Sequence, residues 1–209
     1  MRMADDERHH GIDAKVVAAL DVIGDALHVL ARRTAETHGL SSTQLRILAY
    51  LHHGPPPRAQ STALARELNV ADPTVSDAVG ALHRKGLVER RRDPDDGRQQ
   101  QIVLTLAGRR IAAKAARRMV PAEIALSSID PTQAEDLFIA LLAVLQRFHE
   151  ADLIPVSRSC TTCDHLTVAP GTRSARTHRC AYFDHDLPPS ALRVDCAQHR
   201  TKGSLTAVS

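Results

Sequence analysis

The stretch Ser61–Gln101, STALARELNVADPTVSDAVGALHRKGLVERRRDPDDGRQQQ, decides the fold of this chain. It predicts a short helix, a turn, a second helix and a basic hairpin. In the second helix, apolar residues recur at helical spacing and are expected to face the core: Val75, Val79 and Leu82. Gly86 is expected to end that helix in the left-handed conformation, which glycine adopts without strain.

The opposite face of the second helix carries small polar groups followed by a charge. It presents Thr74, Ser76, Asp77, Gly80 and Arg84, of which the small polar ones could approach the edges of DNA bases. The hairpin adds Arg90, Arg91 and Arg92, then an acidic turn over residues 93–97. A helix-turn-helix followed by a charged hairpin is typical of winged-helix proteins that read DNA.

These residues resemble a family. The segments DPTVSDAVGALHRKGLVERRRDPDDGR and QIVLTLAGRR are similar to the recognition helix and wing of the MarR-type transcriptional regulators. The resemblance extends over about residues 12–150 in the order and spacing of elements. One position departs from it: Asp77 stands where many relatives carry a basic or polar residue, so the family's base preference does not carry over.

The resemblance implies a mostly α-helical winged helix-turn-helix with a small β-wing that binds double-stranded DNA, with a repressor as the expected mode. Arg98 resembles the family arginine that enters the minor groove or grips a phosphate. The expected DNA-contacting residues are Thr74, Ser76, Asp77, Arg84, Arg90, Arg91, Arg92 and Arg98. Similar regulators often bind small aromatic or phenolic effectors, and nothing in the sequence names one.

Charge is concentrated in this part of the chain. Residues 84–118 hold 11 Lys or Arg and 4 Asp or Glu, a local balance of +7 in a chain of net charge +3. Such runs are usually solvated faces. Because this run coincides with the predicted reading helix and wing, it favours a nucleic-acid partner.

Two long helices flank the reading segment. In the first, over residues 12–36, apolar residues step by heptad spacing: Val16, Leu20, Ile23, Leu27 and Leu30. This seam could pack on its own domain or on a second chain, and the family resemblance favours a homodimer formed with the C-terminal helix, which starts at Asp130-Pro131. A two-fold dimer would read a near-palindromic operator, with half-sites about 34 Å apart.

All four cysteines lie in the C-terminal segment 157–200, with the spacing C-x2-C-x16-C-x15-C: Cys160, Cys163, Cys180 and Cys196. The CxxC spacing lets two thiolates bind one metal or cluster. The segment has few apolar residues, so burial alone would not fold it and a metal would supply the missing stabilisation.

The spacing is similar to that of high-potential iron–sulfur proteins, so the prediction favours an iron–sulfur cluster (4Fe–4S or 2Fe–2S) over structural zinc. Two disulfides and free thiols are further alternatives. A cluster would make the tail a redox or iron sensor. Zinc would make it a structural or partner-binding element.

A length of 209 residues fits one domain plus an appendage. We expect 1–11 and 201–209 to be disordered, 12–152 to form the winged-helix and dimerisation domain, and 157–200 to form the cysteine-rich segment. The sequence shows no targeting signal and no apolar stretch that would span a membrane, which predicts a cytoplasmic protein.

Two other classes of function remain open from the sequence. The CxxC tail could serve a redox carrier or a protein-interaction adaptor. An oxidoreductase CxxC normally lies at a strand-to-helix junction of a βαβ unit, and that pattern is absent from the sequence. The sequence also lacks a P-loop, a dinucleotide glycine fingerprint and a nucleophile elbow, so we do not expect an enzyme.

Overall fold

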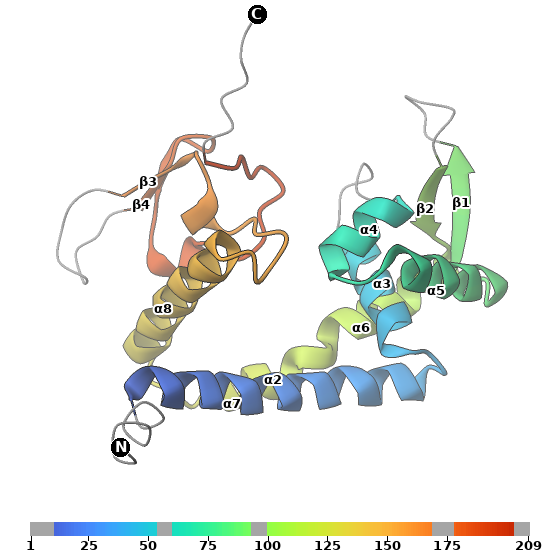
Figure 1. Ribbon diagram of the computed structural model, residues 1–209, viewed down its shortest axis with the longest axis horizontal. Helices are drawn as coiled ribbons and strands as arrows, with labels where there is room; N and C mark the ends of the chain where they lie inside the picture. Colours follow the sequence, from blue (N-terminus) through green and yellow to red (C-terminus); the bar gives the residue numbers. More distant parts are fainter. Residues whose placement is uncertain (1–10, 54–59, 93–99, 169–177, 203–209) are drawn as a thin grey trace, which may run out of the picture. The chain divides into compact units, whose positions relative to one another are not determined.

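The computed structural model describes residues 11–53, 60–92, 100–168 and 178–202 (Figure 1). Several predictions lie outside these residues, namely those on 1–10, on the acidic turn 93–97, on Arg98 and on 203–209. The described residues fall into two compact units. The first unit comprises residues 11–53 and 75–125, and the second comprises 60–74 and 126–202.

The first unit is built from helices and one hairpin. Its helices are α2 (Ile12–Thr37), α3 (Ser42–His53), most of α5 (Asp72–Arg84), α6 (Leu106–Ala116), the 3-10 turn η2 (Arg117–Met119) and α7 (Val120–Leu126). Helix α3 packs on both α6 and α2. Leu45, Ile47 and Leu48 of α3 are fully buried, and so are Val75, Val79 and Leu82 of α5, which confirms the predicted inward face of the second helix.

The hairpin follows α5 directly. Strands β1 (Val88–Arg92) and β2 (Gln100–Leu104) pair antiparallel, with Val88 opposite Leu104 and Arg92 opposite Gln100. Gly86 has φ +66, as predicted for the residue that ends the helix. The mostly α-helical fold with a small β-wing is therefore confirmed.

The base of the hairpin is closed by a set of short contacts between its two ends. The hydroxyl of Thr105 donates to the Gly86 carbonyl at 2.7 Å and accepts from the amide of Gly108 at 3.0 Å, capping α6. The Thr105 amide donates to the Leu87 carbonyl at 3.1 Å. Gly108 lies so close to this carbonyl that a Cβ there would be 1.9 Å from the Leu87 oxygen.

The second unit contains α4 (Ser61–Leu68), the long helix α8 (Pro131–Glu150) and the cysteine-rich segment. Asp130 caps α8 by accepting from the amides of Thr132 and Gln133, at 2.9 and 3.3 Å, which confirms the predicted start of this helix. The segment folds into a three-stranded antiparallel sheet in the order β3–β4–β5: β3 (Leu166–Val168), β4 (His178–Cys180) and β5 (His185–Leu187).

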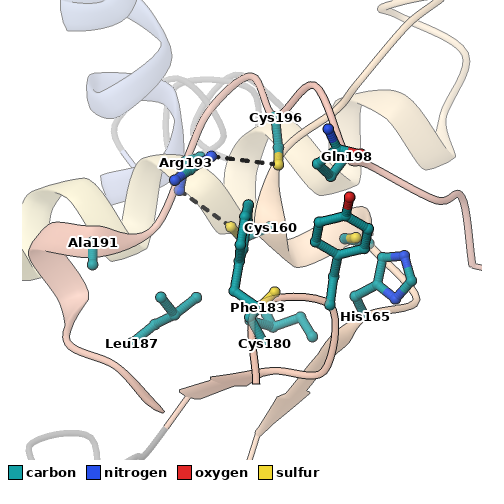
Figure 2. Close-up of a pocket in the computed structure, with 12 residues that line it drawn as sticks. Cys160, His165, Cys180, Phe183, Leu187, Ala191, Arg193, Cys196 and Gln198 are labelled. Carbon is teal, nitrogen blue, oxygen red and sulfur yellow. Dashed lines mark hydrogen bonds between the residues drawn. The ribbon is translucent and has the colours of Figure 1, made fainter. Parts of the chain in front are cut away.

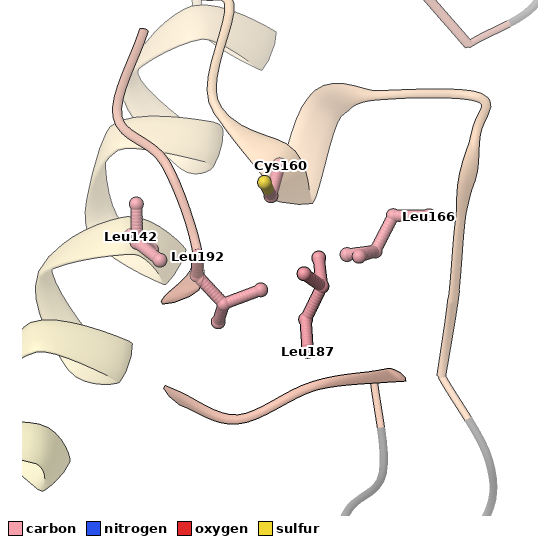
Figure 3. Packing of buried hydrophobic residues seen from close by; sticks show 5 residues of the cluster. All are labelled: Leu142, Cys160, Leu166, Leu187 and Leu192. Carbon is pink, nitrogen blue, oxygen red and sulfur yellow. The ribbon is translucent and has the colours of Figure 1, made fainter. Parts of the chain in front are cut away.

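An apolar cluster joins the cysteine-rich segment to α8 (Figure 3). Leu142 of α8 is buried against Cys160, Leu166, Leu187 and Leu192. Two 3-10 turns of the segment, η3 (Cys160–Thr162) and η5 (Pro189–Ala191), also pack on α8. The segment itself is short of apolar residues, as predicted, and α8 supplies the apolar surface that the sequence did not reveal.

The Gly108 contact gives a test of the hairpin base. Gly108→Ala should lower the free energy of unfolding by about 2 kcal/mol or more, because the added methyl meets backbone that cannot rotate away. Gly24→Ala in α2 is the matched control, since a Cβ there meets nothing within 4 Å. In urea melts we expect this control to be neutral or more stable by about 0.5–1 kcal/mol. Equal stability of the two variants would contradict the described packing.

Candidate nucleic-acid interface and four-cysteine site

The predicted reading face of α5 is exposed. Its predicted contact residues all lie at the surface: Thr74, Ser76, Asp77 and Arg84. The buried residues of the same helix are Val75, Ala78, Val79 and Leu82. This division follows from the helical spacing of the apolar residues, which turns the polar ones outward. The face presents hydroxyl donors and acceptors together with one carboxylate and one guanidinium.

The first strand of the hairpin continues this polar surface with three exposed arginines, Arg90, Arg91 and Arg92. Arg91 is ion-paired with Glu89 on the same strand. At the end of α5, the Lys85 ammonium donates to the Gly39 carbonyl at 2.6 Å and to Gln44 at 3.2 Å. These bonds fix the C-terminal end of the reading helix to the start of α3. Arg98, the predicted wing-tip arginine, lies outside the described residues.

The four cysteines surround one cavity in the second unit (Figure 2). Cys160 starts η3, Cys163 follows that turn, Cys180 ends β4, and Cys196 lies in the loop after η5. The cavity between them has a volume of about 30 Å³, and its walls are mainly apolar. The fold thus brings together all four cysteines that the spacing had singled out.

Several of these thiols are held by named contacts. The Arg193 amide donates to the Cys160 sulfur at 3.2 Å, and the Arg193 guanidinium lies 3.9 Å from the Cys196 sulfur (Figure 2). The same guanidinium lies over the ring of Phe183, 4.9 Å from its centre. Donors aimed at sulfur stabilise thiolates and are a common feature of metal–thiolate and iron–sulfur sites.

Burial raises the pKa of the Cys160 thiol above its ordinary value, and the charges of the other three cysteines raise it further. The hydrogen bond from the Arg193 amide acts in the opposite direction. A bound cation removes this penalty because it pairs the thiolates with positive charge. All four cysteines are free thiols in this structure, which forms neither of the two alternative disulfides.

The geometry bears on which group fits. Among the residues that the structure describes, no three Cys, His, Asp or Glu side chains lie close enough to hold one metal ion. A tetrahedral zinc site needs sulfurs about 3.8 Å apart, given Zn–S bonds of about 2.3 Å. A 4Fe–4S cluster takes each of four cysteines on a different iron, whereas a 2Fe–2S cluster takes two cysteines on each iron.

The C-terminal end of the cysteine-rich segment contacts the CxxC motif. The Asp164 amide donates to the Arg200 carbonyl at 2.7 Å, and the Lys202 ammonium donates to the Thr161 carbonyl at 2.8 Å. The Thr162 hydroxyl lies 3.0 Å from the His199 ring. These contacts place residues after Cys196 against the first two cysteines. They join the two ends of the cysteine-rich segment, which is called the cysteine module below.

The aromatic lining of the cavity was not among the predicted site residues. Tyr182 and Phe183 lie two and three residues after Cys180 and pack edge to face, with ring centres 5.0 Å apart, and the His165 ring centre lies 5.5 Å from that of Tyr182. The chain has only two tyrosines and three phenylalanines, so two of them beside one cysteine was a usable signal. Arg193 carried no signal in the sequence.

Arg158 is a second residue near the cysteines that the sequence did not predict. Its guanidinium donates to both carboxylate oxygens of Glu67 on α4 and to Asp195, each at 2.6 Å. Burial lowers the pKa of Arg158, but the bonds to Asp195 and Glu67 outweigh it, so its pKa lies above the ordinary value. Arg158 therefore keeps its charge at any physiological pH.

Comparisons with known proteins bear on the reading segment. The model of the MarR family matches residues 38–99, which run from just before α3 through β1. The helix-turn-helix is MarR-like. No functionally curated protein sequence matches the chain.

Two solved structures share the fold. A MarR transcriptional regulator from Methanosarcina mazei Go1 superposes with a TM-score of 0.55 at 21% identity, covering 65% of this chain and 97% of that one. An S. aureus MepR–DNA complex superposes with a TM-score of 0.53 at 23% identity, covering 63% of this chain and 96% of that one. About a third of this chain has no counterpart in either structure.

Exposure of the thiols gives a prediction for the metal-free protein. Cys160, Cys163 and Cys196 are buried at 7–8% exposure, whereas Cys180 is half-buried. In protein treated with a chelating agent, iodoacetamide should therefore modify Cys180 first. Peptide mass spectrometry over time measures the order, and urea-unfolded protein is the control in which the four rates converge. Faster modification of Cys160 than of Cys180 would contradict the described cavity.

Proposed function

We propose that this protein is a sequence-specific DNA-binding transcriptional regulator of the MarR type, acting as a repressor. The observation that carries the proposal is the exposed polar face of α5 next to the three exposed arginines of β1. A protein of the same fold, S. aureus MepR, has been crystallised with DNA. Helix α5 would enter the major groove, with Thr74, Ser76, Asp77 and Arg84 toward the bases, and Arg90, Arg91, Arg92 and Arg98 would hold phosphates.

The proposed active species is a homodimer on a near-palindromic operator. Support comes from α2, where Ile12, Val16 and Ile23 share one face and are 73%, 44% and 53% exposed in the single chain; Val16 and Ile23 belong to the predicted heptad seam. An apolar face of this kind on a long helix is a typical interface between chains. It favours the predicted dimer seam over packing within one chain. A small aromatic effector and a cytoplasmic location stay predictions.

None of the described helices is long and apolar enough to cross a membrane. Selecting the genomic DNA fragments that the protein retains would identify the operator and the neighbouring regulated genes. Operator preference over random competitor DNA separates this proposal from a redox carrier or an adaptor that uses the CxxC tail, and we expect no enzymatic activity.

The wing arginines give the test of the DNA-binding surface. Arg92→Gln should weaken binding to a selected duplex roughly tenfold at fixed salt, since it removes a charge-assisted phosphate contact. The slope of log affinity against log salt should fall by about one. Fluorescence anisotropy over a salt series measures both quantities.

Arg147→Gln on α8 is the matched control. It removes the same charge from a side chain that is 80% exposed and paired only with Glu150 among the contacts described. The control should keep both the affinity and the slope. If Arg92→Gln behaves like this control, the wing is not part of the DNA-binding surface.

We further infer that Cys160, Cys163, Cys180 and Cys196 hold an iron–sulfur cluster, with zinc as the second candidate. The cavity that all four thiols line and the amide donor at Cys160 support a shared site, and the spacing of the four cysteines favours a cluster over one zinc ion. Such a cluster would supply a one-electron redox change and sensitivity to iron supply. The chain's own residues would hold it, exclude water with Tyr182 and Phe183, and direct Arg193 at the thiolates.

Protein purified without oxygen should be brown and contain iron and acid-labile sulfide. Cys180→Ser should lose most of the iron while keeping the helical circular dichroism signal, because the apolar cluster on α8 does not depend on Cys180 alone. Metal analysis and visible absorption measure the outcome, and a serine substitution away from the site, Ala113→Ser on α6, is the control. Colourless protein with one zinc per chain would replace the cluster with a structural ion.

A further inference from the structure

Arg158 connects the cysteine module to α4. One terminal nitrogen of its guanidinium donates to both oxygens of Glu67, and its Nε donates to Asp195. The Arg158 and Glu67 side chains are only 15% and 10% exposed, whereas Asp195 is 62% exposed. A pair this buried keeps its geometry, because separating the two groups would leave each charge buried and unpaired.

The backbone of Arg158 is tied to two of the cysteines. Its carbonyl accepts from the amide of Cys196 at 3.1 Å, and Arg158 forms a parallel β-bridge with Asp195. Cys160 follows two residues later, and its amide donates to the Arg193 carbonyl at 2.9 Å. A displacement of Cys196 would therefore reach Arg158 through a backbone hydrogen bond, and a displacement of Cys160 would reach it along the chain.

On the other side, Glu67 lies in the last turn of α4, the first helix of the helix-turn-helix. The turn that follows is short and well capped: Asn69 is left-handed with φ +50, and the amides of Asn69 and Val70 bond the last carbonyls of α4. Residues 69–71 then lead directly into α5. Because only three residues separate the two helices, we expect a shift of α4 to displace the start of α5.

We propose that Arg158 couples the state of the four-cysteine site to α4, so that affinity for DNA depends on whether the cysteines hold their metal or cluster. This rests on the proposed function. The guanidinium is a planar, rigid fork, so a movement of its Asp195 side turns its Glu67 side. Glu67 cannot stay buried without the counter-charge, so α4 follows Arg158.

The experiment uses the full chain in two forms. The loaded form is purified without oxygen, and the stripped form is treated with EDTA and ferricyanide to remove the metal or cluster from the cysteines. The probe is a fluorescent duplex selected by the wild-type protein from a random pool. For the wild type, we expect the affinities of the two forms to differ at least about fivefold, the low end of measured allosteric coupling. Glu67→Gln and Arg158→Gln should bring this ratio close to one.

Glu67→Gln is the sharper variant because Glu67 lies on α4, away from the cysteines. It should keep the wild-type absorption spectrum and metal content while losing the ratio. Arg179→Gln is the matched control: Arg179 also bridges two carboxylates, Asp184 and Asp186, but both lie within the cysteine module. This control should keep the wild-type ratio. Circular dichroism confirms that each variant is folded.

Hydrogen exchange gives a second readout that does not depend on DNA. Amides of α4 should exchange at different rates in the loaded and stripped wild type, and at equal rates in Glu67→Gln. A wild-type ratio in Glu67→Gln, or equal α4 exchange in both wild-type forms, would overturn the coupling. If the loaded and the stripped wild type bind DNA with equal affinity, only the coupling is overturned. If the protein binds neither metal nor DNA, the proposed function is overturned as well.

Discussion

The structure of the first unit depends on the closure at the base of the hairpin, where Thr105 and Gly108 meet Gly86 and Leu87. One hydroxyl serves both sides, donating to the carbonyl at the end of α5 and capping the start of α6. The backbone approach is so close that only glycine fits at position 108. This closure fixes the end of the reading helix, the origin of the wing and the direction of α6 at one point, so the polar face of α5 and the arginines of β1 keep a constant relation.

Most of this could be predicted from sequence because its signals are local. Gly86 supplies a left-handed φ, Thr105 and Asp130 supply caps, and apolar spacing separates the inner and outer faces of α5. Each of these effects acts within one or two helical turns, so neighbouring residues are enough to reveal it. The need for glycine at position 108 is different, since it comes from a carbonyl 21 positions earlier that only the folded backbone brings near.

In the cysteine module, the four ligands could be predicted from the sequence, but the residues that pack around them could not. Four cysteines at fixed spacing indicated a shared site, and the fold gathers all four around one cavity. The docking of Leu166, Leu187 and Leu192 on Leu142 of α8 has no periodic pattern, because the partners come from separate loops and strands. The same is true of Arg158 and Glu67, which are 91 residues apart and carry charges that any surface position could carry.

The interactions that hold this module together decide what the loss of a bound metal or cluster would do to it. In a zinc finger the metal supplies nearly all the folding free energy, so its loss unfolds the domain. Here an apolar cluster on α8 and a closed set of backbone bonds around the CxxC motif hold much of the module without any metal. Loss of the metal or cluster would then move Cys196 and its loop within a module that stays folded. A change of position, unlike unfolding, can be transmitted by a rigid buried ion pair, and Arg158 is placed to transmit it.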